Sequence, residues 1–151
     1  MHPIILKTAE ALLAHFEASG NSSAGIVDLA TLVASADGNI DGAELKMLEG
    51  LLVSMLGAGV EPATLQRMLR SSARQIDSAG IEPSSRALGR LLVTVGGVDE
   101  GLTLALGIAY VSDGISPAER AVINGLANGA EVDAGRLASL EKAIAAAIDA
   151  G

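Results

Sequence analysis

The sequence contains no cysteine and almost no aromatic residues: one Tyr, one Phe and no Trp among 151 residues. Without cysteine there can be no disulfide framework, no thiolate metal site and no cysteine nucleophile. Half of the residues are nevertheless hydrophobic. We therefore expect an aliphatic core built largely on Ala and Leu.

Basic residues are scarce, with 10 Lys and Arg against 18 Asp and Glu, which gives a net charge of −8. An acidic chain repels phosphate backbones, and two aromatic side chains offer little surface on which bases could stack. These features argue against a nucleic-acid partner.

Long hydrophobic runs are also missing. The longest uncharged apolar stretch, 101–112, is too short to span about 30 Å of hydrocarbon. Lys7 and Glu10 interrupt the apolar residues near the N-terminus, so no signal peptide is expected. The sequence predicts a cytoplasmic protein that does not span a membrane.

Apolar residues recur at helical spacing throughout the chain; Ile5, Ala9, Leu12 and Phe16, for example, share one helix face. No segment shows the sustained alternation that is typical of strands. Gly and Pro fall mainly between the helical runs. The pattern predicts an all-α fold and a single domain over 1–151, with eight helices at roughly 3–18, 23–36, 42–57, 62–78, 83–95, 98–112, 117–129 and 133–149.

The two halves of the chain resemble each other. A shift of 76 residues places Gly25 on Gly101 and Asp37 on Asp113, and later matches follow at shifts of 75 and 72. This predicts two pseudo-symmetric four-helix repeats, roughly 1–77 and 78–151. The alternative is that two Ala- and Leu-rich halves align by chance. The second and sixth helices, IVDLATLVASA and LTLALGIAYVS, are apolar nearly all round and are expected to form a buried central pair.

Each central helix is followed by an Asp-Gly corner and a new helix: ADGNIDGAELKMLEGLL and SDGISPAERAVINGLA. Helix capping explains most of these residues. Gly38 and Gly114 can adopt the left-handed conformation that ends a helix. Asp41 with Glu44, and Ser116 with Glu119, have the spacing of a capping box, and Pro117 occupies the favoured first helical position.

Capping does not explain Asp37 and Asp113, because a carboxylate at a helix C-terminus is unfavourable by about 0.3–1 kcal/mol. A hard divalent cation such as Ca²⁺ or Mg²⁺ would relieve that repulsion, since it prefers oxygen ligands. The candidate ligands are Asp37, Asp41 and Glu44 in the first corner, with Asp113 and Glu119 as a weaker copy in the second. Pure capping without metal remains the alternative. The first corner opens like an EF-hand loop, but position twelve is Leu48, so an EF-hand is not expected.

Motifs of catalysis are absent from the sequence: there is no H-E-x-x-H, no P-loop and no G-x-S-x-G. We expect His2 at a flexible terminus and His15 as a surface or half-buried side chain. The sequence therefore favours a non-enzymatic protein, with a small helical enzyme that uses paired carboxylates as a further alternative.

Two copies of an apolar helix, an (S/A)-D-G corner and a Glu-containing helix start resemble the TerB-like family, which includes tellurite-resistance proteins and the N-terminal domain of the co-chaperone DjlA. The resemblance covers nearly the whole chain. It implies an all-helical pseudo-twofold bundle with an acidic, divalent-metal-binding surface, and a bacterial stress-response or adaptor role rather than catalysis. The family's acidic residues would be Asp37, Asp41, Glu44, Asp113 and Glu119.

The second corner departs from the family pattern, because Ser116 stands there and no third acid is present. Lacking cysteine, the chain cannot itself reduce tellurite by thiol chemistry. An unidentified protein partner and a homodimer are both plausible expectations for a small domain with so large an apolar fraction.

Overall fold

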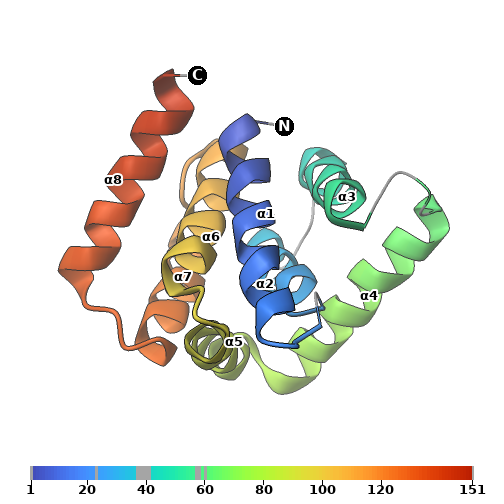
Figure 1. Cartoon of the computed structure of the whole chain (residues 1–151), viewed down its shortest axis with the longest axis horizontal. Coiled ribbons are helices and arrows are strands. Elements are labelled where there is room, and N and C mark those ends of the chain that lie inside the picture. The colour runs from blue at the N-terminus through green and yellow to red at the C-terminus, as the bar shows by residue number, and fades with distance from the viewer. Residues whose placement is uncertain (1, 23, 37–41, 57–58, 60, 151) are drawn as a thin grey trace.

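The chain forms a bundle of helices, as seen in a computed structural model (Figure 1). The structure describes residues 2–22, 24–36, 42–56, 59 and 61–150. Within these ranges the helices are α1 (Pro3–Ala18), α2 (Ala24–Ala34), α3 (Gly42–Leu56), α4 (Pro62–Ala79), α5 (Ile81–Val95), α6 (Val98–Asp113), α7 (Pro117–Gly129) and α8 (Ala134–Ala150). No strand occurs in the same ranges, so the predicted all-α fold is confirmed.

All eight helices begin and end within two residues of the predicted positions, and α2 is one of the two that differ most. It ends at Ala34 rather than at 36. Beyond that end the Ser35 N–H still donates to the Thr31 oxygen at 2.9 Å, and Ser35 Oγ donates to the same oxygen at 2.6 Å. The Ala36 N–H then turns to the Val33 oxygen, three residues back, which tightens the last turn.

The other difference is the start of α5, which begins at Ile81, two residues before the predicted start at Pro83. Gly80 adopts φ +94° and ψ 149°, a conformation open to glycine, and so separates α4 from α5 with a single residue. Pro83 then lies in the first turn of α5, where its missing N–H has no helical partner to lose.

Helices α2 and α6 supply much of the core. Eight of the eleven residues of α2 are buried. The two helices contact each other and lie among the others, whereas α4 and α8 lie at opposite edges of the molecule (Figure 1). The buried apolar residues of α6 are Leu102, Leu104, Ala105, Leu106, Ile108 and Ala109. A helix without a polar face is thus covered on most sides.

Helices α5 and α7 pack closely because glycines stand at their crossing. A Cβ atom on Gly89 would lie 2.3 Å from the carbonyl oxygen of Leu126, and one on Gly129 would lie 2.2 Å from the carbonyl oxygen of Arg86. Only residues without a side chain allow the two backbones to approach this closely. The small residues compensate for the lack of aromatic side chains by tightening the helix packing.

Polar contacts hold α8 against its neighbours. Arg120 of α7 pairs with Glu141, and the bond lowers the pKa of that carboxyl. Tyr110 of α6 donates its hydroxyl to Asp149 at 3.0 Å. The ion pair and the hydrogen bond are largely accessible to solvent, so each contributes modestly to stability.

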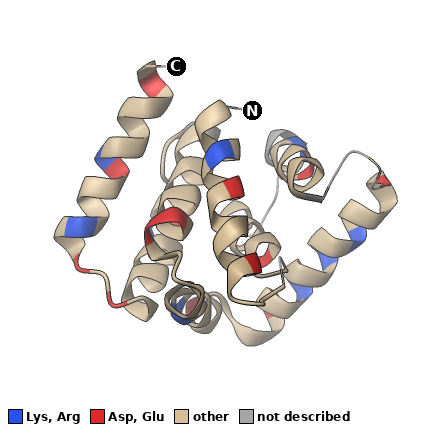
Figure 2. Ribbon diagram, viewed as in Figure 1, with Lys and Arg blue, Asp and Glu red and all other residues tan. Residues whose placement is uncertain are grey.

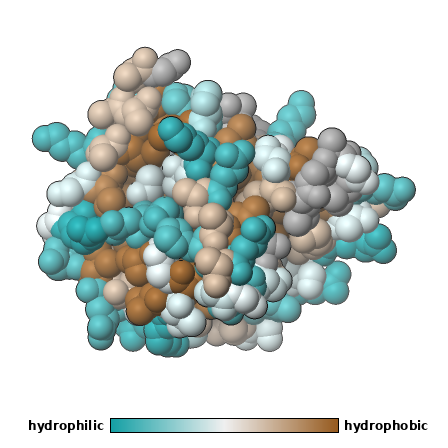
Figure 3. Space-filling model, in the orientation of Figure 1, coloured by the Kyte–Doolittle hydropathy of each residue, from teal (hydrophilic) through white to brown (hydrophobic). Residues whose placement is uncertain are grey.

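The surface is mixed. In the view of Figure 3, hydrophobic residues show mainly in the left half, and the right-hand edge, where α4 lies, is mostly hydrophilic. Across the described ranges, the large hydrophobic side chains that are exposed are Ile81, Val93 and Val111. None of the described helices has the length and hydropathy needed to cross a bilayer.

Candidate functional site

The second Asp-Gly corner lies between α6 and α7. Asp113 is the last residue of α6, which confirms its expected place at a helix C-terminus. Gly114 follows with φ +78° and donates its N–H to the Tyr110 oxygen at 3.2 Å. Its positive φ agrees with the prediction, but its ψ of 172° lies outside the left-handed helical region.

The predicted capping box at the start of α7 is present. Ser116 Oγ accepts the N–H of Glu119 at 3.1 Å, and Glu119 Oε1 accepts the N–H of Ser116 at 3.0 Å. Pro117 occupies the first turn, as predicted. The Glu119 residue is only 7% exposed. One oxygen of this candidate metal ligand is thus already engaged by the backbone.

The first corner is only partly covered by the structure. Asp37 and Asp41 lie outside the described residues, and so does Gly38. Glu44 belongs to α3 and Asp113 to α6, but the side chains of both fall outside the described part of the molecule. Among the side chains that the structure does describe, no group of three His, Cys, Asp or Glu could hold a metal ion. The metal site therefore stays a prediction.

The two histidines have structural partners. His2 is the N-cap of α1, because its Nδ1 accepts the N–H of Ile4 at 3.2 Å. The sequence analysis did not foresee this cap, for which Pro3 at the first helical position was the available signal. His15 is half-buried, as expected, and its Nε2 lies 3.0 Å from Glu100 Oε2 of α6.

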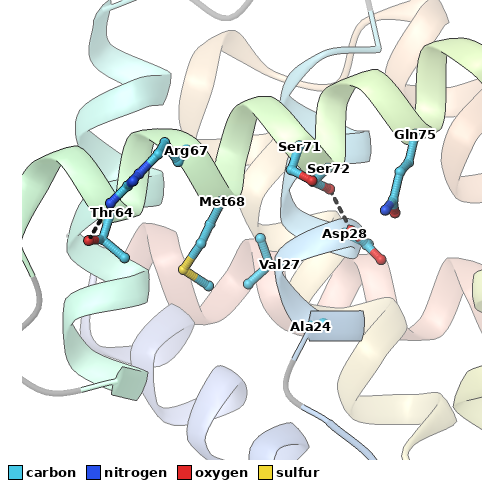
Figure 4. A pocket seen from close by; sticks show the side chains of 9 residues that line it. All are labelled: Ala24, Val27, Asp28, Thr64, Arg67, Met68, Ser71, Ser72 and Gln75. Carbon is cyan, nitrogen blue, oxygen red and sulfur yellow. Dashed lines mark hydrogen bonds between the residues drawn. The ribbon is translucent and has the colours of Figure 1, made fainter.

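A groove of about 360 Å³ runs between α2 and α4, and sequence reasoning missed it (Figure 4). At its centre Ser72 Oγ donates to Asp28 Oδ1 at 2.6 Å. Met68 and Val27 point toward each other beside this pair. Its lining is Ala24, Val27, Asp28, Thr64, Arg67, Met68, Ser71, Ser72 and Gln75. The signal was a single carboxylate within the otherwise apolar sequence of α2, whose partner lies 44 residues further along the chain.

A second hollow of about 270 Å³ adjoins the groove and shares Asp28 and Gln75 with it. It extends toward α5, where Leu88 and Leu91 contribute to its lining. The two hollows form a strip of mixed polar and apolar surface along α4. Concave surfaces with a few polar groups among apolar ones are the usual form of binding sites.

Arginines follow the outer side of α4. Arg67, Arg70 and Arg74 are all exposed, and spacings of three and four residues place them on one side of the helix. Figure 2 shows basic residues along α4, at one edge of the molecule. Arg67 donates to Thr64 Oγ1 at 3.3 Å. We call Arg67, Arg70 and Arg74 the arginine ridge.

Comparison of the chain with known protein families, with curated proteins and with solved structures finds no match. The features of the chain that bear on its function are the two corners, the groove between α2 and α4, and the arginine ridge beside it.

Proposed function

We propose that the protein is a non-enzymatic, TerB-like adaptor built from two four-helix repeats, which binds a divalent cation at its first Asp-Gly corner and serves a cytoplasmic bacterial stress response. The repeat carries this proposal, since the resemblance to the family depends on it. The whole chain, 1–151, would form one such domain.

Equivalent turns after α1 and α5 support the repeat. Gly20 has φ +76° and Gly96 has φ +75°, at the shift of 76 residues that the sequence suggested. Beyond them, the Asn21 N–H donates to the Phe16 oxygen at 2.9 Å, and the Gly97 N–H donates to the Leu92 oxygen at 3.0 Å. Many helices end with such a cap, and α7 does so too, with Glu131 at φ 58° and the Val132 N–H donating to the Ala127 oxygen. The support for the repeat therefore comes from the matching positions of the caps after α1 and α5.

Packing supports the repeat as well. A Cβ on Gly25 would meet Phe16 Cε2 at 2.6 Å, and a Cβ on Gly101 would meet Leu92 Cδ2 at 2.4 Å, again at the same shift. Several contacts between helices follow the same rule, but those of α3 with α4 and of α2 with α7 do not. Helix α1 contacts α3 as α5 contacts α7, α2 contacts α4 as α6 contacts α8, and α1 contacts α6 as α5 contacts α2.

We place the cation at the first corner. Its sequence offers three carboxylates, Asp37, Asp41 and Glu44. The second corner offers only Asp113 and Glu119, and Glu119 already uses one oxygen in the capping box. Ca²⁺ and Mg²⁺ favour several oxygen ligands, so the richer corner is the better candidate.

The test is the melting temperature of the protein in EDTA and after addition of Ca²⁺, Mg²⁺, Mn²⁺ or Zn²⁺. An ion at about 100 times its Kd adds roughly 2.7 kcal/mol of stability. For a protein of this size that corresponds to a rise of about 5–11 °C. Asp37→Asn should abolish the rise, and Asp113→Asn should largely retain it. Glu17→Gln on the exposed side of α1 is the control for loss of one negative charge.

The alternative is a purely structural protein-interaction module whose acidic corners are caps without metal. The observed Ser116–Glu119 capping box favours this reading for the second corner. If no ion raises the melting temperature, or if Asp37→Asn responds to ions as the unmodified protein does, this alternative replaces the metal proposal. Size-exclusion chromatography with light scattering tests the expected homodimer.

A further inference from the structure

We propose that the arginine ridge and the adjoining α2–α4 groove bind an acidic, amphipathic helical segment of a partner protein. This inference rests on the adaptor role proposed above and names the class of partner that the adaptor would take. It does not depend on the metal, because none of the described residues that line the groove is a predicted metal ligand.

The arginines of the ridge form no ion pair with a described residue, although Asp77 lines the same hollow as Arg70 and Arg74. Ion pairs within the described residues are formed by His15, Arg86, Arg120 and Arg136, and none involves Arg67, Arg70 or Arg74. The three arginines span about 10 Å along the helix, at 1.5 Å per residue. Carboxylates spaced by three and four residues on a partner helix would match this arrangement, and arginine binds carboxylates through paired hydrogen bonds.

Charge is distributed unevenly over the molecule. Residues 62–95, which include α4 and α5, contain five arginines and two carboxylates, a net charge of +3. The remainder has five basic against sixteen acidic residues, a net charge of −11. An acidic partner is repelled by most of the surface and attracted at α4, which restricts where and how it docks.

The groove supplies the apolar part of the contact. Ala24, Val27 and Met68 line it beside the ridge, and methionine adapts easily to different side chains. Asp28 also lines the groove and accepts the Ser72 hydroxyl. Its carboxylate would repel an acidic side chain in the groove, so the partner's apolar face fits the groove while its carboxylates lie over the ridge.

Other anionic partners fit less well. A nucleic acid extends beyond three arginines and would meet the strongly acidic remainder of the surface, and the chain has only two aromatic residues. A bilayer would need apolar side chains beside the basic ones. The exposed large hydrophobics found in the structure, Ile81, Val93 and Val111, belong to α5 and α6 rather than to α4.

The test uses a designed peptide of about 18 residues, long enough to form a marginal helix. It has Leu on one face and Glu at i, i+3 and i+7 on the adjacent face. Fluorescence anisotropy gives its Kd, and amide NMR shifts locate its site on the protein. We expect saturable binding, with shifts in α4 and in the part of α2 that lines the groove, and weaker binding at higher salt.

The decisive variant is Arg67→Glu with Arg74→Glu, and its matched control is Lys7→Glu with Lys142→Glu. All four side chains are exposed, and both doubles change the net charge equally. The ridge double should weaken binding at least about tenfold, equivalent to about 1.4 kcal/mol, while the control changes it less than about twofold. Circular dichroism and melting curves check that both variants fold.

Several results would overturn the inference. These are equal loss of binding in both doubles, no saturable binding at about 1 mM peptide, or equal binding of a peptide with Lys in place of Glu. Tighter binding of a single-stranded oligonucleotide or of phosphatidylserine vesicles would assign the ridge to another class of partner. Concentration-dependent self-association that the ridge double abolishes would assign it to a second copy of the chain.

The metal titration separates this inference from the proposed function. Peptide binding without any metal-induced stabilisation would overturn the metal site and leave the docking surface. Metal-induced stabilisation without peptide binding would do the reverse.

Discussion

The crossing of α5 and α7 offers a sharp test of how this protein is packed. In Gly125→Ala, the new Cβ would lie 2.6 Å from Ser85 Cβ. Carbon atoms prefer separations of about 3.5–4.0 Å, so the two helices must move apart by about 1 Å. Ser85→Gly removes the obstructing side chain, and the Cα atom that remains lies 4.0 Å from the new Cβ.

The expected free energies follow from opposing effects. Overpacking costs about 1–3 kcal/mol, and Gly→Ala within a helix regains up to about 1 kcal/mol, so Gly125→Ala should lose about 1–2 kcal/mol. Ser85→Gly should lose about 0.5–1 kcal/mol because glycine is unfavourable inside a helix. The double variant should lie within about 1 kcal/mol of the unmodified protein, because the clash is gone and the two propensity changes oppose each other.

Urea denaturation of the four proteins measures the interaction as a double-mutant cycle, provided that the slope against urea stays constant. Gly125→Ala alone should also melt about 2–8 °C lower. The control is Gly135→Ala near the start of α8, where the Cβ meets only Asp133 Oδ1 at 3.4 Å and stability should not fall. Additive losses in the double variant would refute the close-packing argument.

Two further predictions concern polar contacts. Ser116→Ala should lower the free energy of unfolding by about 1 kcal/mol, because the N-cap of α7 is lost. The control is Ser139→Ala at an exposed position of α8, which should change that free energy little. Equal losses for the two variants in urea denaturation would contradict the capping role. Tyr110, the single tyrosine, should ionise above its ordinary pKa of 10.0, because the hydrogen bond to Asp149 holds the protonated phenol and burial and the negative charge of Asp149 act in the same direction. The contribution of this bond to folding stability is therefore complete below the ordinary pKa and is lost as pH rises through the raised pKa. In Asp149→Ala, the phenolate absorbance of Tyr110 should titrate at lower pH. An unchanged titration would exclude the contact.

Local signals explain why the helices could be predicted within two residues. The spacing of apolar residues defines each helix. Helix ends depend on backbone geometry that neighbouring residues determine: Gly96 ends α5, and Ser116 with Pro117 begins α7. The capping box is such a signal, since donor and acceptor lie three residues apart. His2 shows the limit of this reasoning, because its role as the cap of α1 was not predicted.

The candidate site was less predictable. The acidic corners were found from sequence because their carboxylates are close along the chain, but Glu119 proved to be engaged in a cap, and the metal site remains a prediction. The arginine ridge was hidden by the overall charge of −8, from which only repulsion of a phosphate backbone was inferred. Averages over a chain do not report how charge is distributed over its faces.

By itself, the sequence determined which segments are helical, where they stop, and that the core is aliphatic, because these properties depend on side chains within one or two helical turns. Only the tertiary structure decided that Asp28 lies against Ser72 and that Gly89 and Gly129 face the backbone of a second helix. Those contacts join residues 37 or more positions apart. Which surfaces meet depends on how all the helices pack together, which no local pattern encodes.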